Sequence, residues 1–465
     1  MKYIRKLKKQ PILLLLIAWF SLAWSWTLFT DSLDLAGSKV QGVILAIIIS
    51  AINVAISTTI VWKTARVVRW IFNKYNPWLS LAFALPLFAL ADFLIAWLTA
   101  IIWLGPQGKV DNILPLSSPT LLAINTPFGF AARFVGFYGL AAFIWLTLFL
   151  LCWKRFRIYT VVPLAVLSVL ALIGYGVYRT PSGTSFEAKI ISESLQERVP
   201  AIDASNTDLT VFPEYGLDEL TPETYSTRIL MNEPGNTSKH YFLGSEQVNL
   251  PDKTGHLNRL LYGNTAEGVT HKQDKFRLIP GGEDLSFTVR TGLRATNQKA
   301  TLDYFSYAKS VLKGPHQLTP FKINDTTLIG SAVCSSIIAP QDYRYFADHG
   351  ATAFTNSASL TIFKGSPVFA FQQKSLARFM AVSNARFFLQ SANSARAYAL
   401  DTNGNTVAEA TGHKVLDVTV HNNTTKTFYT LSGEWLEYIG IAVALWCIYE
   451  FKFRTRVKPS TTKKK

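Results

Sequence analysis

Six long apolar stretches constrain this chain more than any other feature. A helix needs about 20 mostly apolar residues to cross the hydrocarbon core of a bilayer, and each stretch is near that length. They cover residues 11–30, 40–62, 77–104, 127–153, 158–178 and 435–449. The first has no convincing small-residue cleavage site after it, so we expect a retained helix and not a signal peptide. The sequence therefore predicts a multi-pass helical membrane protein.

Lysine and arginine gather in short segments between these stretches. Segments 1–10, 63–74, 154–157 and 452–465 are basic and contain no Asp or Glu, whereas loops 31–39 and 105–126 hold one basic residue each. Basic loops stay in the cytoplasm, so all four segments are expected on that side. The net charge of +16 then reflects membrane topology and anionic lipid headgroups, and nucleic acid is not expected as a partner.

This topology divides the chain into four parts. Residues 1–179 form an N-terminal transmembrane domain of about five helices, and 180–433 form an extracytoplasmic domain. A C-terminal transmembrane helix follows at 434–451, and 452–465 are a basic cytoplasmic tail. We expect a monomer in the cytoplasmic membrane, with the large domain on its extracytoplasmic side.

The large domain alternates apolar strand-like runs with helical patterns, which is typical of an α/β domain. Residues 183–200 are compatible with a helix, and a longer amphipathic helix leads into a strand over 371–393. Asn403-Gly404 marks the turn of a hairpin. Two charges fall inside predicted membrane helices, Asp92 and Arg133. Intramembrane charges are usually paired, so we expect these two to meet, with lipid headgroup binding by Arg133 as the alternative.

Two residues of the large domain have positions suited to chemistry. Glu214 directly follows the apolar run and proline of VFPEYGL. A carboxylate at the end of a buried strand can have its pKa raised until it serves as a base. Cys334 has no cysteine partner within 180–433, so it is either a small buried hydrophobe or a nucleophile. A plain salt bridge remains the alternative for the carboxylate.

Three motifs in order, VFPEYGL, YAKSVL (307–312) and GSAVCSS, resemble the carbon–nitrogen hydrolase (nitrilase) superfamily. That superfamily uses a Glu-Lys-Cys triad. The resemblance implies a nitrilase-like αββα sandwich, with Glu214 as general base, Lys309 as the triad lysine and Cys334 as nucleophile. The backbone N–H of Ser335 would stabilise the oxyanion.

Membrane helices on both sides of such a domain are similar to the apolipoprotein N-acyltransferase family. This likeness implies transfer of a phospholipid acyl chain, through a Cys334 thioester, to the N-terminal amine of a diacylglyceryl-cysteine lipoprotein. No cofactor or metal is implied. The loop SLTIFKGSPVF is expected to line the acyl path, with ordinary core packing as the alternative; its candidate residues are Leu360, Ile362, Phe363 and Phe369.

The sequence also departs from the family pattern. An acidic residue usually stands eight positions after the lysine, where this reading finds Gln317, and Lys313 is an alternative lysine. An aromatic and a glutamate usually follow the nucleophile, where Ser335 and Ser336 stand here. A membrane-tethered amidase or hydrolase, transfer to another amine, and a non-catalytic scaffold therefore remain open.

Overall fold

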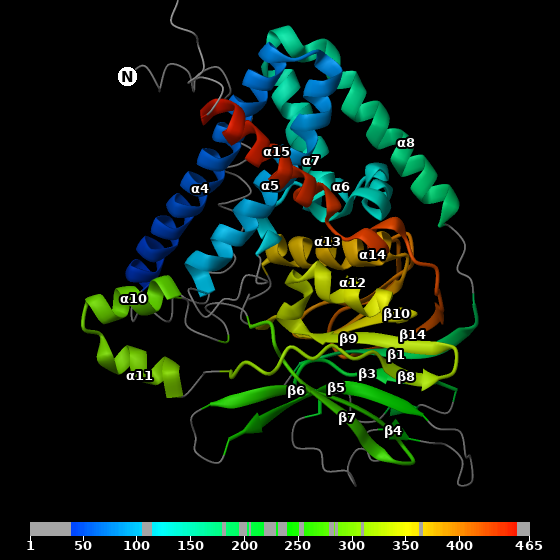
Figure 1. Cartoon of the computed structure of the whole chain (residues 1–465). Helices are drawn as coiled ribbons and strands as arrows, with labels where there is room; N and C mark the ends of the chain where they lie inside the picture. Colours follow the sequence, from blue (N-terminus) through cyan, green and yellow to red (C-terminus); the bar gives the residue numbers. More distant parts are fainter. Residues whose placement is uncertain are drawn as a thin grey trace, which may run out of the picture.

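A computed structural model gives the fold of the chain (Figure 1). It describes residues 39–104, 114–178, 183–194, 202–203, 206–217, 229–230, 240–250, 255–278, 283, 287–307, 311–361 and 366–452. The helical part contains α4 (Lys39–Lys74), α5 (Pro77–Leu104), α6 (Thr120–Ala123), α7 (Ala132–Cys152), α8 (Val161–Val177) and α15 (Trp435–Lys452). The predicted segment at 11–30 lies outside the described residues.

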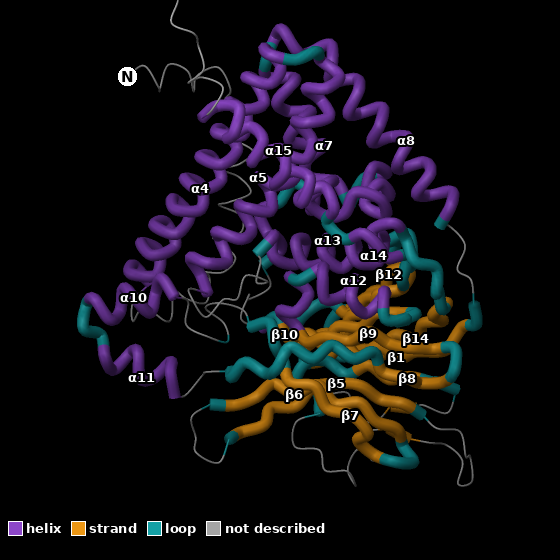
Figure 2. The backbone as a smooth tube through the Cα atoms, in the orientation of Figure 1, coloured by secondary structure: helices purple, strands orange, loops and turns teal. Residues whose placement is uncertain are grey.

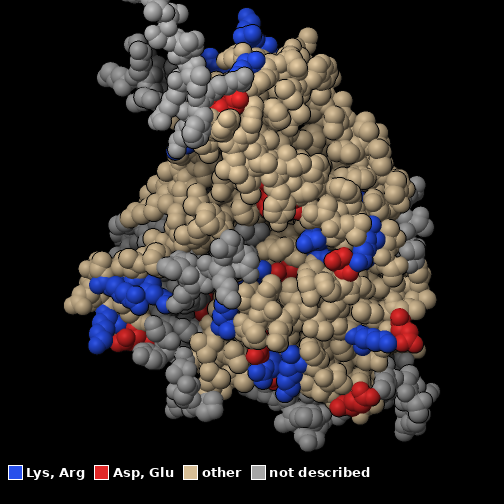
Figure 3. Space-filling view, in the orientation of Figure 1, with Lys and Arg blue, Asp and Glu red and all other residues tan. Residues whose placement is uncertain are grey.

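Three spans of the described chain are long and apolar enough to cross a membrane: Pro77–Ile102, Pro127–Cys152 and Lys154–Val177. They correspond to three of the predicted segments, which are thereby confirmed as apolar helices. Figure 3 shows the same property from outside, because the helical part has a broad uncharged surface with basic atoms gathered at its far end. The segments predicted at 40–62 and 435–449 are helical, within α4 and α15, and their membrane crossing stays a prediction.

Close packing joins these helices. A side chain at Gly440 of α15 would place its Cβ 2.3 Å from the carbonyl oxygen of Pro86 in α5, so only glycine permits this approach. The predicted meeting of Asp92 and Arg133 is wrong. Asp92 accepts hydrogen bonds from Ser118 Oγ at 2.6 Å and Trp145 Nε1 at 2.9 Å.

Arg133 instead connects the helical part to the α/β domain. Its guanidinium donates to the carbonyl oxygens of Gly174 at 2.7 Å, Val382 at 2.9 Å and Thr402 at 2.6 Å. The first acceptor belongs to α8 and the other two belong to the α/β domain. Carbonyl acceptors from both parts therefore satisfy this buried cation.

A sheet of twelve strands forms the frame of the described α/β domain. Its members are β1 (Ser185–Glu193), β3 (Leu209–Val211), β5 (Tyr241–Asn249), β6 (His256–Asn264), β7 (Gly268–Asp274), β8 (Phe321–Asn324), β9 (Thr327–Val333), β10 (Ala353–Ser359), β11 (Phe387–Asn393), β12 (Ala397–Leu400), β13 (Thr406–Ala410) and β14 (Lys414–His421). The main path runs β7-β6-β5-β3-β1-β11-β10-β9-β8, and β2 (Ile202–Asp203) pairs separately with β4 (Ile229–Leu230). Strands β3, β1, β11, β10 and β9 are parallel, so their carboxyl ends share one edge.

The sheet folds over on itself. Tyr262 of β6 stacks on Phe321 of β8 with ring centroids 4.8 Å apart, although these strands lie near opposite ends of the strand order. Figures 1 and 2 show the layer of α12 (Pro340–Asp348), α13 (Pro367–Asn384) and α14 (Phe428–Ser432) between this sandwich and the long helices of the helical part. Helices α10 (Phe287–Ala295) and α11 (Lys299–Tyr307) lie at its side. The structure thus contains three layers of the predicted αββα sandwich, namely one helical layer and the two packed halves of the sheet. The described residues show no second helical layer.

Where a helix is expected over 183–200, residues Ser185–Glu193 form strand β1, and 195–200 lie outside the described residues. Phe186, Ala188 and Ile190 are buried at alternate positions, a period of two that suits a strand and not a helix. The expected hairpin is confirmed: β12 and β13 are antiparallel, and Gly404 takes the turn with φ of 77°. Helix α13 leads into β11 as expected.

Candidate active site

Glu214 and Cys334 meet where parallel strands end. Glu214 follows β3 and Cys334 follows β9, while Ser359 is the last residue of β10 between them. The Ser359 N–H donates to Glu214 Oε2 at 2.8 Å, and the Cys334 thiol donates to the Ser359 carbonyl oxygen at 3.4 Å. One residue therefore holds both the carboxylate and the sulfur, at the sheet edge where α/β folds bind their ligands.

The backbone at this edge is strained. Cys334 has φ of 46° and Tyr215, directly after Glu214, has φ of 63°. Non-glycine residues in this left-handed region cost on the order of 1 kcal/mol or more, and they persist where the surroundings fix them. Both strained positions lie at the sheet edge that Glu214 and Cys334 share.

The lysine that contacts Glu214 is Lys275, directly after β7. Its Nζ lies 3.0 Å from Glu214 Oε1 and also contacts Glu283 Oε1, with the Lys275 side chain fully buried. Asn258 of β6 donates to the same Glu214 oxygen and accepts from the Lys275 backbone N–H at 2.8 Å. Lys309, the predicted triad lysine, lies outside the described residues.

A sequence signal for this lysine was available in KFRLIPGGE. Lys275 and Glu283 are separated by the eight positions that the family pattern requires. Counted from Lys309, the same position falls on Gln317, which is exposed on a loop, whereas the carboxylate that contacts Lys275 is Glu283. This lysine is hard to recognise in the sequence because Gln273 stands two residues before it, where the Tyr-x-Lys pattern expects a tyrosine.

Ser335 lies beside the nucleophile and is buried. Its hydroxyl lies within hydrogen-bonding distance of two acceptors, Glu283 Oε2 at 3.1 Å and the carbonyl oxygen of Arg277, and donates its one proton to either. The side chain therefore fixes Glu283, while the oxyanion role of the Ser335 backbone stays a prediction. No group of three or more His, Cys, Asp or Glu placed to hold a metal ion occurs in the described part of the chain.

The electrostatics favour a neutral thiol at rest. Burial, and then the charge of Glu214, raise the pKa of Cys334 well above its ordinary value. Burial also raises the pKa of Glu214, against the lowering effects of Lys275 and of a hydrogen bond with Cys334. Burial alone would lower the pKa of Lys275, but the two carboxylates raise it well above its ordinary value. Moving the thiol proton to Glu214 would leave the net charge of this group unchanged.

This balance predicts a pH dependence. Only ionised Glu214 can accept the thiol proton, and its pKa lies above the ordinary 4.5. The rate of Cys334 acylation should therefore fall as the pH decreases through that raised pKa, and the fall should start at a higher pH than a solvent-exposed glutamate would give. Single-turnover rates across the acid range measure this. A rate that stays flat down to pH 4.5 would contradict Glu214 as the base.

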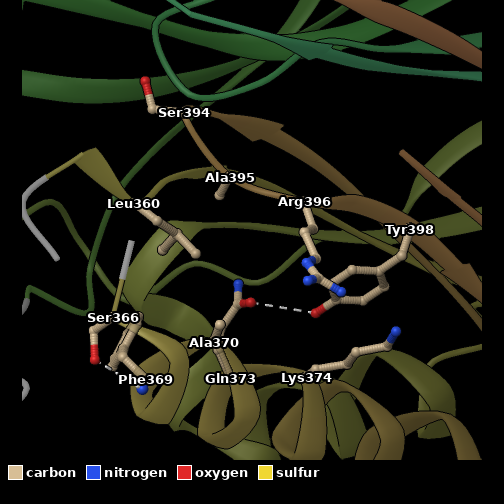
Figure 4. Close-up of a pocket in the computed structure, with 10 residues that line it drawn as sticks. All are labelled: Leu360, Ser366, Phe369, Ala370, Gln373, Lys374, Ser394, Ala395, Arg396 and Tyr398. Atoms are coloured by element: carbon tan, nitrogen blue, oxygen red, sulfur yellow. Dashed lines mark hydrogen bonds between the residues drawn. The ribbon is translucent and has the colours of Figure 1, made fainter. Parts of the chain in front are cut away.

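A cavity of about 130 Å³ lies beside this site, and its lining includes Leu360, the residue after Ser359. Figure 4 shows α13 on one side of it and the segment after β11 on the other. Two of the predicted acyl-path residues, Leu360 and Phe369, line it, whereas Ile362 and Phe363 lie outside the described residues. The remaining lining residues are Ser366, Ala370, Gln373, Lys374, Ser394, Ala395, Arg396 and Tyr398.

Buried amides connect this cavity to the nucleophile. Gln373 exchanges hydrogen bonds with Gln390, and Tyr398 donates to both side chains (Figure 4 shows its bond to Gln373). Asn356 donates to Gln390 Oε1 at 3.3 Å and to the Cys334 carbonyl oxygen at 3.5 Å. Such a connected network fixes the floor of the cavity relative to the sulfur.

No protein-family model and no curated protein matches this sequence. Solved structures of the nitrilase superfamily are similar to it. A branch 10 member from Saccharomyces cerevisiae is 15% identical over 56% of this chain and 95% of its own, with a TM-score of 0.35. A CN-hydrolase superfamily protein from Xanthomonas campestris is 15% identical over 60% and 98%, with a TM-score of 0.35. A mutant amidase from Nesterenkonia is 10% identical over 56% and 98%, with a TM-score of 0.36. At these values the likeness concerns the fold alone.

Proposed function

We propose that this chain is a nitrilase-superfamily enzyme of the membrane, which transfers an acyl chain from a phospholipid to an amine. The observation that carries the proposal is that Glu214 and Cys334 both bond Ser359 while Lys275 pairs with Glu214. A buried carboxylate, a buried ammonium and a thiol together form a general base, an electrostatic stabiliser and a nucleophile. Glu214, Lys275 and Cys334 follow three different strands, β3, β7 and β9. A cysteine that only packed in the core, and a salt bridge that only stabilised the fold, would not need to lie together.

The reaction proceeds in two halves. Cys334 Sγ attacks the ester carbonyl while Glu214 takes the thiol proton, and the Lys275 ammonium stabilises the negative charge on the carbonyl oxygen. The lysophospholipid oxygen leaves with the proton from Glu214, and a thioester remains on Cys334. An amine then attacks this thioester, Glu214 takes the amine proton, and the proton returns to sulfur as the amide leaves.

The helical part supports a lipid as the acyl donor. Three helices long and apolar enough to cross a membrane precede the α/β domain in the chain, so acyl donors are available at high local concentration. Leu360 and Phe369 provide an apolar wall beside the nucleophile for an acyl chain. We place the α/β domain on the extracytoplasmic side and take the amine of a diacylglyceryl-cysteine lipoprotein as acceptor, following the basic-loop pattern and the family resemblance.

Acyl transfer is tested by following Cys334 through one turnover. The full chain in phospholipid nanodiscs should gain one acyl chain on Cys334, seen by mass spectrometry of its peptide. Adding a peptide with an N-terminal diacylglyceryl-cysteine should discharge the adduct and yield the N-acyl peptide, much faster than water does. Cys152 and Cys447 are the internal controls and should stay unmodified.

Other outcomes would change the assignment. Discharge by water at the same rate with and without the amine would identify a hydrolase. Discharge by simple amines but not by the lipopeptide would identify a different acceptor. Absence of any adduct on Cys334, in protein that is folded, would refute covalent catalysis.

A further inference from the structure

A second cavity, of about 290 Å³, lies where the membrane helices meet the α/β domain. Its lining does not include Glu214, Lys275 or Cys334. Side chains of α5, α7, α12, α14 and α15 surround it. The lining residues are Phe93, Phe137, Tyr138, Pro340, Gln341, Arg344, Tyr429, Ser432, Gly433, Glu434, Glu437 and Tyr438.

One wall of this cavity is a broken helix. Helix α7 is interrupted at Gly136, which has φ of 73° and ψ of −166°. The freed N–H groups of Phe137 and Tyr138 donate to the two carboxylate oxygens of Glu434 at 2.8 and 3.0 Å. A Cβ at Gly136 would lie 2.6 Å from Glu434 Oε2, so glycine is required. Within a membrane protein, such irregular backbone is found where it is buried in protein or lines a cavity.

Two buried polar atoms of the cavity lining lack a partner in the described structure. They are the Tyr138 hydroxyl and Glu437 Oε2. Tyr138 is only 3% exposed, so its hydroxyl cannot rely on bulk water. An unpaired buried group costs about 1–3 kcal/mol, and each such group requires an explanation. A ligand with hydrogen-bond donors would satisfy the carboxylate oxygen, and the hydroxyl can accept as well as donate.

The rest of the lining specifies the charge of that ligand. Five of the lining side chains are aromatic, and aromatic faces attract organic cations, particularly beside carboxylates. The lining holds two carboxyl groups, Glu434 and Glu437, and one guanidinium, Arg344. A cation bound beside the carboxyl groups would favour their ionised form, so the lining as a whole suits a cation. Arg344 is held at one side by its bond to the Thr430 carbonyl oxygen at 3.0 Å, where it suits an anionic group next to the cation.

We propose that this cavity binds an organic ammonium group, held by Glu437, Tyr138 and the surrounding aromatic rings. The cavity joins apolar helices to the α/β domain, so a membrane lipid with an ammonium headgroup is one source of this chemistry. A free amine is the other. This site is independent of the proposed acyl transfer, because none of its residues touches Cys334, Lys275 or Glu214 in the contacts described above.

Binding can be measured without turnover in the full chain carrying Cys334→Ala. Native mass spectrometry of protein released from nanodiscs would compare a phosphatidylethanolamine with a phosphatidylglycerol of the same acyl chains. We expect about tenfold tighter binding of the ethanolamine lipid, as a desolvated cation site should give. Free ethanolamine as a competitor distinguishes the sources: displacement indicates that the ammonium suffices, and no displacement indicates that the whole headgroup is recognised.

Two variants and one matched control decide the proposal. Glu437→Gln should bring the two lipids to within about twofold of each other, because it keeps the side-chain shape and removes the charge. Tyr138→Phe should reduce the preference by about three- to tenfold, as loss of one hydrogen bond predicts. Glu450→Gln, at the other end of α15 where Glu450 pairs with Lys74, should leave the preference unchanged. Equal binding of both lipids by the parent protein, or a preference that persists in Glu437→Gln, would overturn the proposal.

Discussion

Cys334→Ala is expected to abolish acyl transfer, with a loss of about 10⁴-fold or down to the uncatalysed background. Alanine removes the atom that carries the acyl chain, and no neighbouring nucleophile replaces it, since Ser335 directs its hydroxyl to Glu283. Folding should be little affected, because the change removes only the sulfur atom, whose hydrogen bond to the Ser359 carbonyl oxygen is long at 3.4 Å. Single-turnover formation of the N-acyl product measures the loss, and the thermal midpoint checks the fold.

The matched control is Cys447→Ala. Cys447 is also buried but lies on α15, away from the strand edge, and its variant should keep at least half of the parent rate, as a change outside a catalytic centre should. Acyl transfer by folded Cys334→Ala at more than a few per cent of the parent rate would remove the thioester from the mechanism.

Lys275→Met should reduce the rate of Cys334 acylation by about 10³-fold, whereas Lys309→Met should change it less than about twofold. Lys275 Nζ lies between Glu214 and Glu283, so its loss removes the charge that stabilises the oxyanion and leaves two carboxylates facing each other. The same loss should destabilise the fold by about 3–5 kcal/mol, as expected when one partner of a buried ion pair is deleted.

A double variant distinguishes loss of catalysis from loss of folding if Lys275→Met unfolds. The double variant Lys275→Met with Glu283→Gln removes one positive and one negative charge together, and should recover stability without recovering activity. Chemical denaturation and the acylation rate, measured on the same samples, separate the two effects. A folded Lys309→Met protein without activity would transfer the lysine role back to residue 309.

Much of this architecture could be predicted because its signals are local. The apolar helices over 77–104 and 127–153 follow from length and composition alone. Glu214 and Cys334 were identified because each ends an apolar run, and the ends of parallel strands share an edge. A hairpin turn at Asn403-Gly404 is equally local.

The rest depends on contacts between distant residues. YAKSVL matched the expected tyrosine and lysine better than KFRLIPGGE did, but only tertiary structure shows that Lys275 reaches Glu214. Arg133 appeared to need a carboxylate, yet carbonyl oxygens from α8 and the α/β domain satisfy it. The break of α7 at Gly136 depends on Glu434, nearly three hundred residues later, and no local pattern could reveal it.

The antiparallel pairing of β1 with β14 has a mechanical consequence. These are the first and last strands of the α/β domain, and they pair from Ser185 with His421 to Ser192 with Lys414. The two chain segments that connect the domain to α8 and α15 therefore leave it side by side. A force that separated those segments would unzip the ladder one pair at a time, and not shear all its hydrogen bonds at once. The bonds of Arg133 to Gly174, Val382 and Thr402 join α8 to the α/β domain separately from these segments, so they would share such a force with the ladder.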